Sequence, residues 1–441
     1  MGPDKLHFLE VYQSKLTTPE KAVEAVHSGD RVFVGFASNT AYTLMDALWR
    51  RRNEVEDVTL LSSNGLKSCK LYNGDEKNSF RICTPFTGVG ERAAAAHGRP
   101  LEYTSYHLSQ VDLWMREIGR PRVAFLMVSP PDREGYMSFG CSGPCVDRYA
   151  KELAELVILQ INRAVPYVTG QDCLIHVSEA DMIVEADEDL GQLPEDTSND
   201  TFQAISEHIL AEIPDGATIQ LGIGKLSTAI GYGLRTRNDL GIHSELFSEP
   251  MMHLMQAGNV TNRQKGFLDG KSVFSFAMGT RALYDFMDRN PAVYGAPFPF
   301  VNAPSIIARN NRMISINSAM AIDLLGQVSS ESMGWRQFSA VGGQMDFAKG
   351  AQMSPGGKSF LAMSSTFLKD GVRHSKIVLQ FPVGTVVTTP RSEVQYVATE
   401  FGCVNLKRLT NQDRIRAIIS LAHPDFRDEL TQQAKQSRLI D

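Results

Sequence analysis

Short runs of apolar, β-prone residues alternate with helix-like segments from one end of the chain to the other. Residues 31–36 (RVFVGF) precede a polar turn and the helical pattern of residues 43–51 (TLMDALWRR). Further apolar runs follow at residues 58–63, 123–130 and 156–162. Strands that read as continuous apolar runs are buried on both faces, which is typical of parallel sheets covered by helices. The pattern predicts an α/β fold.

An acidic stretch interrupts this alternation at residues 184–200 (VEADEDLGQLPEDTSND). Its carboxylates and its Gly and Pro residues indicate a solvated linker, although an exposed loop inside one domain would have the same composition. We therefore expect an N-terminal α/β domain over residues 1–186, a linker over residues 187–200, and a C-terminal α/β domain over residues 201–441.

The second half of the chain repeats features of the first. Residues 28–38 (SGDRVFVGFAS) align with residues 214–225 (PDGATIQLGIGK), and the alignment pairs glycine with glycine twice. Later, residues 176–185 resemble residues 390–400, with a Ser–Glu pair in both. Two matches in the same order predict an internal duplication, with two related open α/β domains whose sheets are largely parallel.

The C-terminal end of the chain changes to a helical pattern. Thr410 suits the N-cap position, Asp413 supports it three residues later, and residues 415–419 supply an apolar face. The pair His423 and Pro424 ends this helix. The pattern predicts a helical cap after the second α/β domain.

Composition and charge narrow the class of protein. The 441 residues are 43% hydrophobic, 8% aromatic and 21% charged, which excludes a disordered or fibrous chain. A formal charge of −6 lacks the basic excess of nucleic-acid binders. The sequence shows neither an export signal nor an apolar run that would span a bilayer, and its six cysteines are sparse. We expect a cytoplasmic enzyme without nucleic-acid or membrane partners.

Several common catalytic signatures are absent. Gly357–Ser359 ends like a phosphate-binding loop, but Gln352 stands where that motif needs its first glycine. Gly222, Ile223 and Gly224 lack the third glycine of a dinucleotide fingerprint, since Ser227 occupies its place. Neither a Gly-x-Ser-x-Gly elbow nor a His-Glu-x-x-His helix occurs. Cys141 and Cys145, without a second pair, favour structural thiols over a metal site.

Glu245 is a candidate catalytic carboxylate. It follows His243 by two residues in a strand-like run that Gly241 and Pro250 bound. Open α/β sheets place their ligands beyond the carboxyl ends of parallel strands, where this glutamate is expected. A salt-bridged or exposed glutamate is the alternative that the pattern leaves open.

Two glycine-containing segments are candidates for ligand contact. In residues 218–234, a strand ends in glycines before a helix, so backbone N–H groups can approach an anion or a thioester oxygen. The pair Gly342 and Gly343 suits a backbone donor hole for an oxyanion. A second pair in the same segment, Gly356 and Gly357, precedes Lys358, which can contact a phosphate or a carboxylate as a point charge. Tight turns and surface loops are the alternatives.

Taken together, these motifs resemble the acetyl-CoA hydrolase/transferase family, and within it the branch of 4-hydroxybutyrate and butyryl-CoA:acetate CoA-transferases. The resemblance covers nearly all of the chain. It is carried by residues 128–140, 165–185, 220–229, 240–247, 341–351 and 396–406. The glycine pairs and the glutamate are specific for the family in combination.

The resemblance implies a role for each candidate residue. Glu245 would be the nucleophile that carries coenzyme A as a glutamyl thioester, and the Gly343 amide would contribute to the oxyanion hole. The residues implied to contact coenzyme A are Gly222, Ile223, Gly224, Lys225, Leu226, Gly342 and Lys358. Lys225 and Leu226 stand where relatives often have small residues, so this sequence departs from the family pattern there.

The expected activity is short-chain acyl-CoA:carboxylate CoA transfer, with 4-hydroxybutyryl-CoA or butyryl-CoA and acetate as substrates. Splitting the exchange through a covalent glutamyl intermediate makes both halves reversible. Coenzyme A enters as a substrate, no cofactor or metal is expected to be tightly bound, and relatives suggest a homo-oligomer, commonly a dimer. Two alternatives stay open: an acyl-CoA hydrolase that uses the same glutamate, and a non-catalytic acyl-CoA-binding protein.

Overall fold

The computed structural model describes residues 3–74, 79–99, 101–195 and 197–441. The chain forms two compact units, the first from residues 1–194 and 273–300, the second from residues 195–272 and 301–441. The passage from the first unit to the second falls within the linker expected at residues 187–200. Among the described residues, no helix combines the length and the apolar character needed to cross a membrane.

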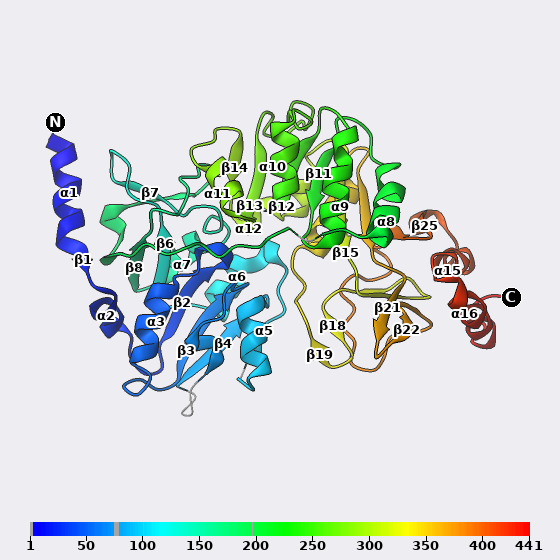
Figure 1. Cartoon of the computed structure of the whole chain (residues 1–441), viewed down its shortest axis with the longest axis horizontal. Coiled ribbons are helices and arrows are strands. Elements are labelled where there is room, and N and C mark those ends of the chain that lie inside the picture. The colour runs from blue at the N-terminus through cyan, green and yellow to red at the C-terminus, as the bar shows by residue number, and fades with distance from the viewer. Residues whose placement is uncertain (1–2, 75–78, 100, 196) are drawn as a thin grey trace. The chain divides into compact units, whose positions relative to one another are not determined.

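The first unit is built on a parallel sheet in the strand order β1-β10-β8-β6-β2-β3-β4-β5. Figure 1 shows β2, β3 and β4 side by side in blue. The strands of this sheet are β1 (Leu16–Thr17), β2 (Arg31–Phe36), β3 (Val58–Ser63), β4 (Phe80–Thr84), β5 (Leu101–Tyr103), β6 (Val123–Val128), β8 (Leu156–Ile161) and β10 (Met182–Glu185). A separate antiparallel pair consists of β7 (Tyr136–Ser138) and β9 (Leu174–His176).

The apolar runs in the sequence lie in this sheet, as predicted. All six residues of β6 are buried, which agrees with a strand covered on both faces. Helix α3 (Tyr42–Arg50) buries Leu44, Met45 and Leu48 in the same core. The other helices of the unit are α1 (Pro3–Lys15), α2 (Pro19–Ala22), α4 (Lys70–Asn73), α5 (Val89–Ala96), α6 (Val111–Glu117), α7 (Asp147–Leu153) and α11 (Arg281–Met287).

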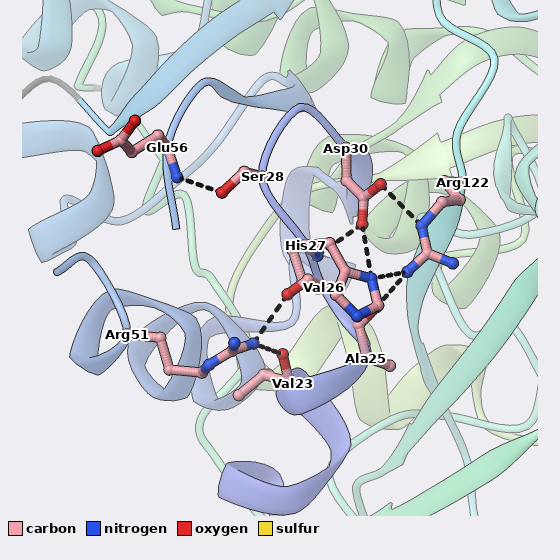
Figure 2. Close-up of polar contacts among 9 residues, drawn as sticks. All are labelled: Val23, Ala25, Val26, His27, Ser28, Asp30, Arg51, Glu56 and Arg122. Atoms are coloured by element: carbon pink, nitrogen blue, oxygen red, sulfur yellow. Dashed lines mark hydrogen bonds and ion pairs between the residues drawn. The ribbon is translucent and has the colours of Figure 1, made fainter. Parts of the chain in front are cut away.

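Polar contacts fasten the loops at the amino ends of two central strands, β2 and β6 (Figure 2). Arg122 precedes β6, and its Nε donates to Asp30 Oδ1 over 2.7 Å, while Asp30 Oδ2 accepts the backbone N–H of His27 over 2.7 Å. Arg51, just after α3, donates to the carbonyl of Val26 over 2.9 Å. These contacts hold the segments that lead into β2 and β6.

Residues 273–300 were expected in the C-terminal domain but belong to the first unit. Most of β13 (Ser272–Ala277) and all of β14 (Val293–Gly295) lie in this segment. The ring of Phe36 meets those of Phe276 and Phe298 edge to face, with centroids 5.1 and 5.6 Å apart. The backbone N–H of Ala277 donates to the carbonyl of Cys141 over 2.7 Å. Aromatic packing and backbone pairing to residues far away in sequence therefore decide where this segment belongs.

In the second unit the main strands run in the order β12-β11-β15-β20-β24-β25, parallel except for the last pair. They are β11 (Thr218–Leu221), β12 (Gly241–Phe247), β15 (Met313–Ser318), β20 (Lys358–Ala362), β24 (Tyr396–Thr399) and β25 (Gly402–Asn405). Smaller strands are β16 (Ala321–Asp323), β17 (Val328–Ser329), β18 (Ser332–Met333), β19 (Arg336–Gln337), β21 (Thr366–Lys369), β22 (Val372–Ser375) and β23 (Ile377–Val378).

Helices α8 (Asp200–Leu210), α9 (Lys225–Gly233) and α10 (Glu249–Gln256) pack side by side in the second unit, drawn in green in Figure 1. Helix α14 (Gln344–Met353) packs against β15, β20 and α13 (Pro304–Ile307). The short helix α12 (Phe298–Val301) contains the point where the chain returns to this unit.

The two sheets confirm the internal duplication. The order β10-β8-β6-β2-β3 of the first unit matches the order β24-β20-β15-β11-β12 of the second. The sequence alignment pairs Arg31 with Thr218, which begin β2 and β11, and Met182 with Tyr396, which begin β10 and β24. Each sequence repeat therefore marks one equivalent strand of two related domains.

The predicted C-terminal helical cap is also confirmed. Thr410 Oγ1 accepts the backbone N–H of Asp413 over 3.3 Å at the start of α15 (Asn411–Ser420). The apolar face of α15 at residues 415–419 is buried where predicted, at Ile415, Ile418 and Ile419. The helix ends before His423, which precedes α16 (Pro424–Gln436).

Candidate active site

Glu245 lies near the carboxyl end of β12, as its sequence context predicts. The neighbouring parallel strand β11 ends at Leu221 and is followed by Gly222. The register pairs Ile219 with Ile242, and Ser244 Oγ donates to the carbonyl of Leu221 over 3.4 Å, so Gly222 is level with Glu245. We call this side of the second unit's sheet the carboxyl edge. The glutamate and the first glycine segment therefore meet at the edge where open α/β sheets bind ligands.

The Glu245 carboxylate is held by a buried amide. Asn302 is 0% exposed, and its Nδ2 donates to Glu245 Oε2 over 2.6 Å. Sequence reasoning missed Asn302, because an asparagine before Ala303 and Pro304 reads as an ordinary residue at a helix start. Only the fold brings residue 302 next to residue 245.

Gly343 completes the surroundings of the carboxylate. A Cβ at this position would lie 1.9 Å from Glu245 Oε2 and 2.2 Å from Asn302 Nδ2, so no side chain fits. Gly342, immediately before it, has φ +61°, a left-handed conformation that favours glycine. The pair thus lets the backbone at the start of α14 lie against the glutamate, as a donor loop requires.

Burial raises the pKa of Glu245 to about 7. The hydrogen bond from Asn302 opposes this effect and favours the charged form, whereas the nearby carboxylate of Asp346 adds to it. Asp346 lies in the first turn of α14 and is 4% exposed. A carboxyl group that titrates near neutral pH exchanges readily between its acid and its nucleophilic anion.

His243 is a second titratable group on the same strand. It is fully buried, and its Nε2 donates to the backbone carbonyl of Val301 over 2.8 Å. Burial, reinforced by the charge of Lys265, lowers the pKa of His243 to about 3, so the ring is neutral. Lys265 is itself 1% exposed, donates to the carbonyls of Ile242 and Lys271, and has its pKa lowered to about 7 by burial.

The segment after β11 offers both exposed and buried residues. Ile223 is 48% exposed and Lys225 is exposed, whereas Gly222 and Gly224 are partly buried. Gly224 has φ +94° and caps α9. Leu226 is only 4% exposed, so its side chain presents little surface to a ligand. The predicted contacts of this segment with coenzyme A stay predictions.

Lys358 is not brought to the glutamate. It begins β20 and therefore lies at the amino end of that strand, opposite to the carboxyl edge. Its Nζ donates to Oε2 and to the backbone carbonyl of Glu212, over 2.6 and 2.8 Å. The predicted contact of Lys358 with coenzyme A stays a prediction, and this arrangement gives it no support.

The chain is similar over nearly its whole length to known proteins. Models of the N-terminal and C-terminal domains of the acetyl-CoA hydrolase/transferase family match residues 3–193 and 279–434. The chain is 40% identical to 4-hydroxybutyrate coenzyme A transferase of Clostridium kluyveri, over 97% of this chain and 99% of the relative. It is 34% identical to butyryl-CoA:acetate CoA-transferase of Anaerostipes caccae, over 98% and 99%. The crystal structure of RipA from Yersinia pestis superposes with a TM-score of 0.91 at 36% identity, over 98% and 100% of the two chains.

Proposed function

Because the chain belongs to the acetyl-CoA hydrolase/transferase family, we propose that it moves coenzyme A from a short-chain acyl-CoA to a free carboxylate through Glu245. One observation carries the role of this residue. The Glu245 carboxylate lies at the carboxyl edge, held by the Asn302 amide against a backbone that has room for no side chain at residue 343.

The first half-reaction needs the anionic form of Glu245. Asn302 engages Oε2, so Oε1 is the oxygen that attacks the acyl carbonyl carbon. The carbon–sulfur bond breaks, the CoA thiolate leaves, and a mixed anhydride forms between the acyl group and Glu245. The thiolate then attacks the glutamyl carbonyl, the first carboxylate departs, and glutamyl-CoA remains.

The second half-reaction reverses these steps with a different acid. The incoming carboxylate attacks glutamyl-CoA, releases the thiolate and forms a new mixed anhydride. The thiolate then attacks the new acyl carbonyl, which yields the product acyl-CoA and restores the Glu245 carboxylate. The thioester bond energy is conserved throughout, provided that water is kept from the intermediates.

Each attack passes through a tetrahedral oxyanion. The backbone N–H of Gly343, at the start of α14, is the donor that we assign to it, together with the positive end of the helix. Removing one such donor costs about 3 kcal/mol of transition-state stabilisation. The same close approach that excludes a Cβ at residue 343 places this backbone beside the reacting carboxylate.

The names of the relatives support a choice of substrates. We propose 4-hydroxybutyryl-CoA or butyryl-CoA as the donor and acetate as the acceptor, because those are the acids named for the Clostridium and Anaerostipes relatives. Coenzyme A is bound as a substrate in this proposal, with no tightly held cofactor. The cytoplasmic location and the homo-oligomeric state expected from the sequence belong to the same proposal.

Trapping the intermediate tests the assignment. The protein is incubated with butyryl-CoA and then reduced with borohydride, which converts a glutamyl thioester to an alcohol that peptide mass spectrometry locates. We expect the label at Glu245, and none in Glu245→Gln. Full exchange activity in Glu245→Ala would overturn the nucleophile assignment. Release of free CoA at a rate that acetate leaves unchanged would indicate a hydrolase instead, and binding without turnover would indicate a sensor.

A further inference from the structure

His243 and Glu245 project from the same face of β12. Side chains alternate between the faces of a strand, so residues two apart share one. The His243 ring is fully buried and donates its Nε2–H to the carbonyl of Val301 over 2.8 Å. The ring also lies 6.3 Å, between centroids, from Phe347 of α14, one turn beyond Gly343. His243 therefore touches the two segments that surround the carboxylate.

The bond from His243 fixes the peptide group that leads into Asn302. The carbonyl of Val301 and the backbone nitrogen of Asn302 belong to one planar peptide unit. Holding the carbonyl therefore restricts where the Asn302 side chain begins. From there its Nδ2 reaches back 2.6 Å to Oε2 of Glu245. Two hydrogen bonds therefore connect His243 and Glu245 of β12 through the segment Val301–Asn302.

The neutral His243 ring carries its proton on Nε2, the nitrogen that donates to Val301. A carbonyl oxygen can only accept, so Nε2 carries the proton. Within the described part of the chain, Nδ1 is buried and has no hydrogen-bond partner. A buried acceptor without a partner is unfavourable, and an apolar side chain would avoid it. The histidine is therefore better explained by the bond that its other nitrogen makes than by stability of the core.

We propose that His243 is a positioning residue for CoA transfer, because its bond to Val301 holds the Asn302 amide on the Glu245 carboxylate. This inference rests on the proposed role of Glu245 as nucleophile. The carboxylate of Asp346 on α14 disfavours the Glu245 anion, and burial together with the charge of Lys265 keeps His243 neutral.

Two polar variants of His243 test whether its effect depends on the hydrogen bond to Val301 or on packing. In His243→Gln the side-chain amide nitrogen extends about as far as Nε2, so it can still donate to Val301. In His243→Asn the amide stops about where Nδ1 lies and cannot reach that carbonyl. Both variants are uncharged, so the charge near Lys265 stays the same. The measurement is the rate of glutamyl-CoA formation against pH, in single turnover.

We expect His243→Asn to move the acidic limb of this profile upward by about one pH unit. The hydrogen bond from Asn302 to the Glu245 anion weakens in this variant, so the pKa of Glu245 rises. His243→Gln should restore most of the shift. In an Asn302→Leu background, His243→Asn should move the limb no further, because the amide through which it acts is gone. An unmoved limb in His243→Asn would overturn the inference, and so would an equal shift in both backgrounds. Loss of thermal stability with an unmoved limb would show a merely structural histidine.

A readout without turnover separates this inference from the proposed function. The pH dependence of the free energy of unfolding is compared between each protein and its Glu245→Gln version, which isolates the ionisation of Glu245. We expect His243→Asn to move the pH at which the two unfolding free energies diverge, and His243→Gln to leave that pH unchanged. No movement in His243→Asn would contradict the inference. Failure of borohydride to label Glu245 in the unchanged protein would overturn the nucleophile assignment, while this comparison still decides whether His243 acts on the carboxylate.

Discussion

The Asn302 amide donates to Oε2 of Glu245 over 2.6 Å, and it does so from a fully buried position. Burial and this hydrogen bond have opposite effects on the pKa of Glu245. Burial raises the pKa of the carboxyl group, while the amide stabilises its anion. The outcome, a pKa of about 7, keeps the nucleophile partly ionised at neutral pH although it is largely withdrawn from water.

The first prediction concerns the pH dependence of transfer. Only the Glu245 anion attacks, so the rate of glutamyl-CoA formation should rise as pH increases through about 7 and level off above about 8. Below the midpoint it should fall about tenfold per pH unit. Rapid-quench measurement of the carboxylate released in one turnover checks this, with an acyl-CoA that lacks ionising groups in its acyl chain. A profile that is flat between about pH 5 and pH 8 would contradict the role of the raised pKa.

The second prediction concerns stability. The pKa of Glu245 is raised from 4.5 to about 7 on folding, so the folded protein holds the proton more tightly, and stability falls as pH rises between these values. Glu245→Gln carries no charge and should be more stable than the parent above about pH 8, by up to about 3 kcal/mol. Near pH 4 the two proteins should unfold at about the same urea concentration. If the parent and Glu245→Gln are equally stable at both pH values, burial does not disfavour the Glu245 carboxylate.

The third prediction concerns the glycine beside the carboxylate. In Gly343→Ala the added Cβ would lie 1.9 Å from Glu245 Oε2, so the carboxylate or the donor loop must move. Transfer should drop at least about 100-fold, with substrate binding affected less, because the oxyanion donor is displaced. Gly270→Ala is the control, since nothing lies within 4 Å of a Cβ there, although its φ of +76° costs some stability. Near-normal turnover in Gly343→Ala would exclude this backbone from the reaction.

The fourth prediction concerns the glycine that follows β11. A Cβ at Gly222 would meet only Ser227 Oγ, at 3.7 Å, so Gly222→Ala should fold normally. Any change in its KM for acyl-CoA therefore reports a ligand that approaches the backbone closely. We expect an increase of about tenfold in KM, measured with unaltered circular dichroism and melting temperature. An unchanged KM would place the bound coenzyme A away from this residue.

The fifth prediction concerns Lys358. Its ion pair with Glu212 is partly exposed, with side-chain exposures of 27% and 40%, so Lys358→Ala should lower stability by no more than about 1 kcal/mol. The KM for acyl-CoA should change less than about threefold, in step with Glu212→Gln. An increase of more than about tenfold in Lys358→Ala alone would establish the contact with coenzyme A that the sequence suggests.

Much of the architecture could be predicted from local pattern. The apolar runs that became β2, β3, β6 and β8 are written in adjacent residues, and so is the cap of α15 at Thr410. Glu245 and the glycine pair were found because strand ends and glycine loops have local signatures. The return of residues 273–300 to the first unit has no such signature, because it depends on contacts with Phe36 and Cys141.

The fold class and the duplication could be read from the sequence alone, and the resemblance of its motifs to a known family implied which residue is the nucleophile. Hydrophobic periodicity and motif spacing are properties of neighbouring residues, and they survive without knowledge of the fold. Three relations became visible in the folded chain: Asn302 donates to Glu245, His243 donates to the carbonyl of Val301, and Lys358 pairs with Glu212. Those relations join residues tens to more than a hundred positions apart, and their energies depend on burial and distance, which a linear sequence does not contain.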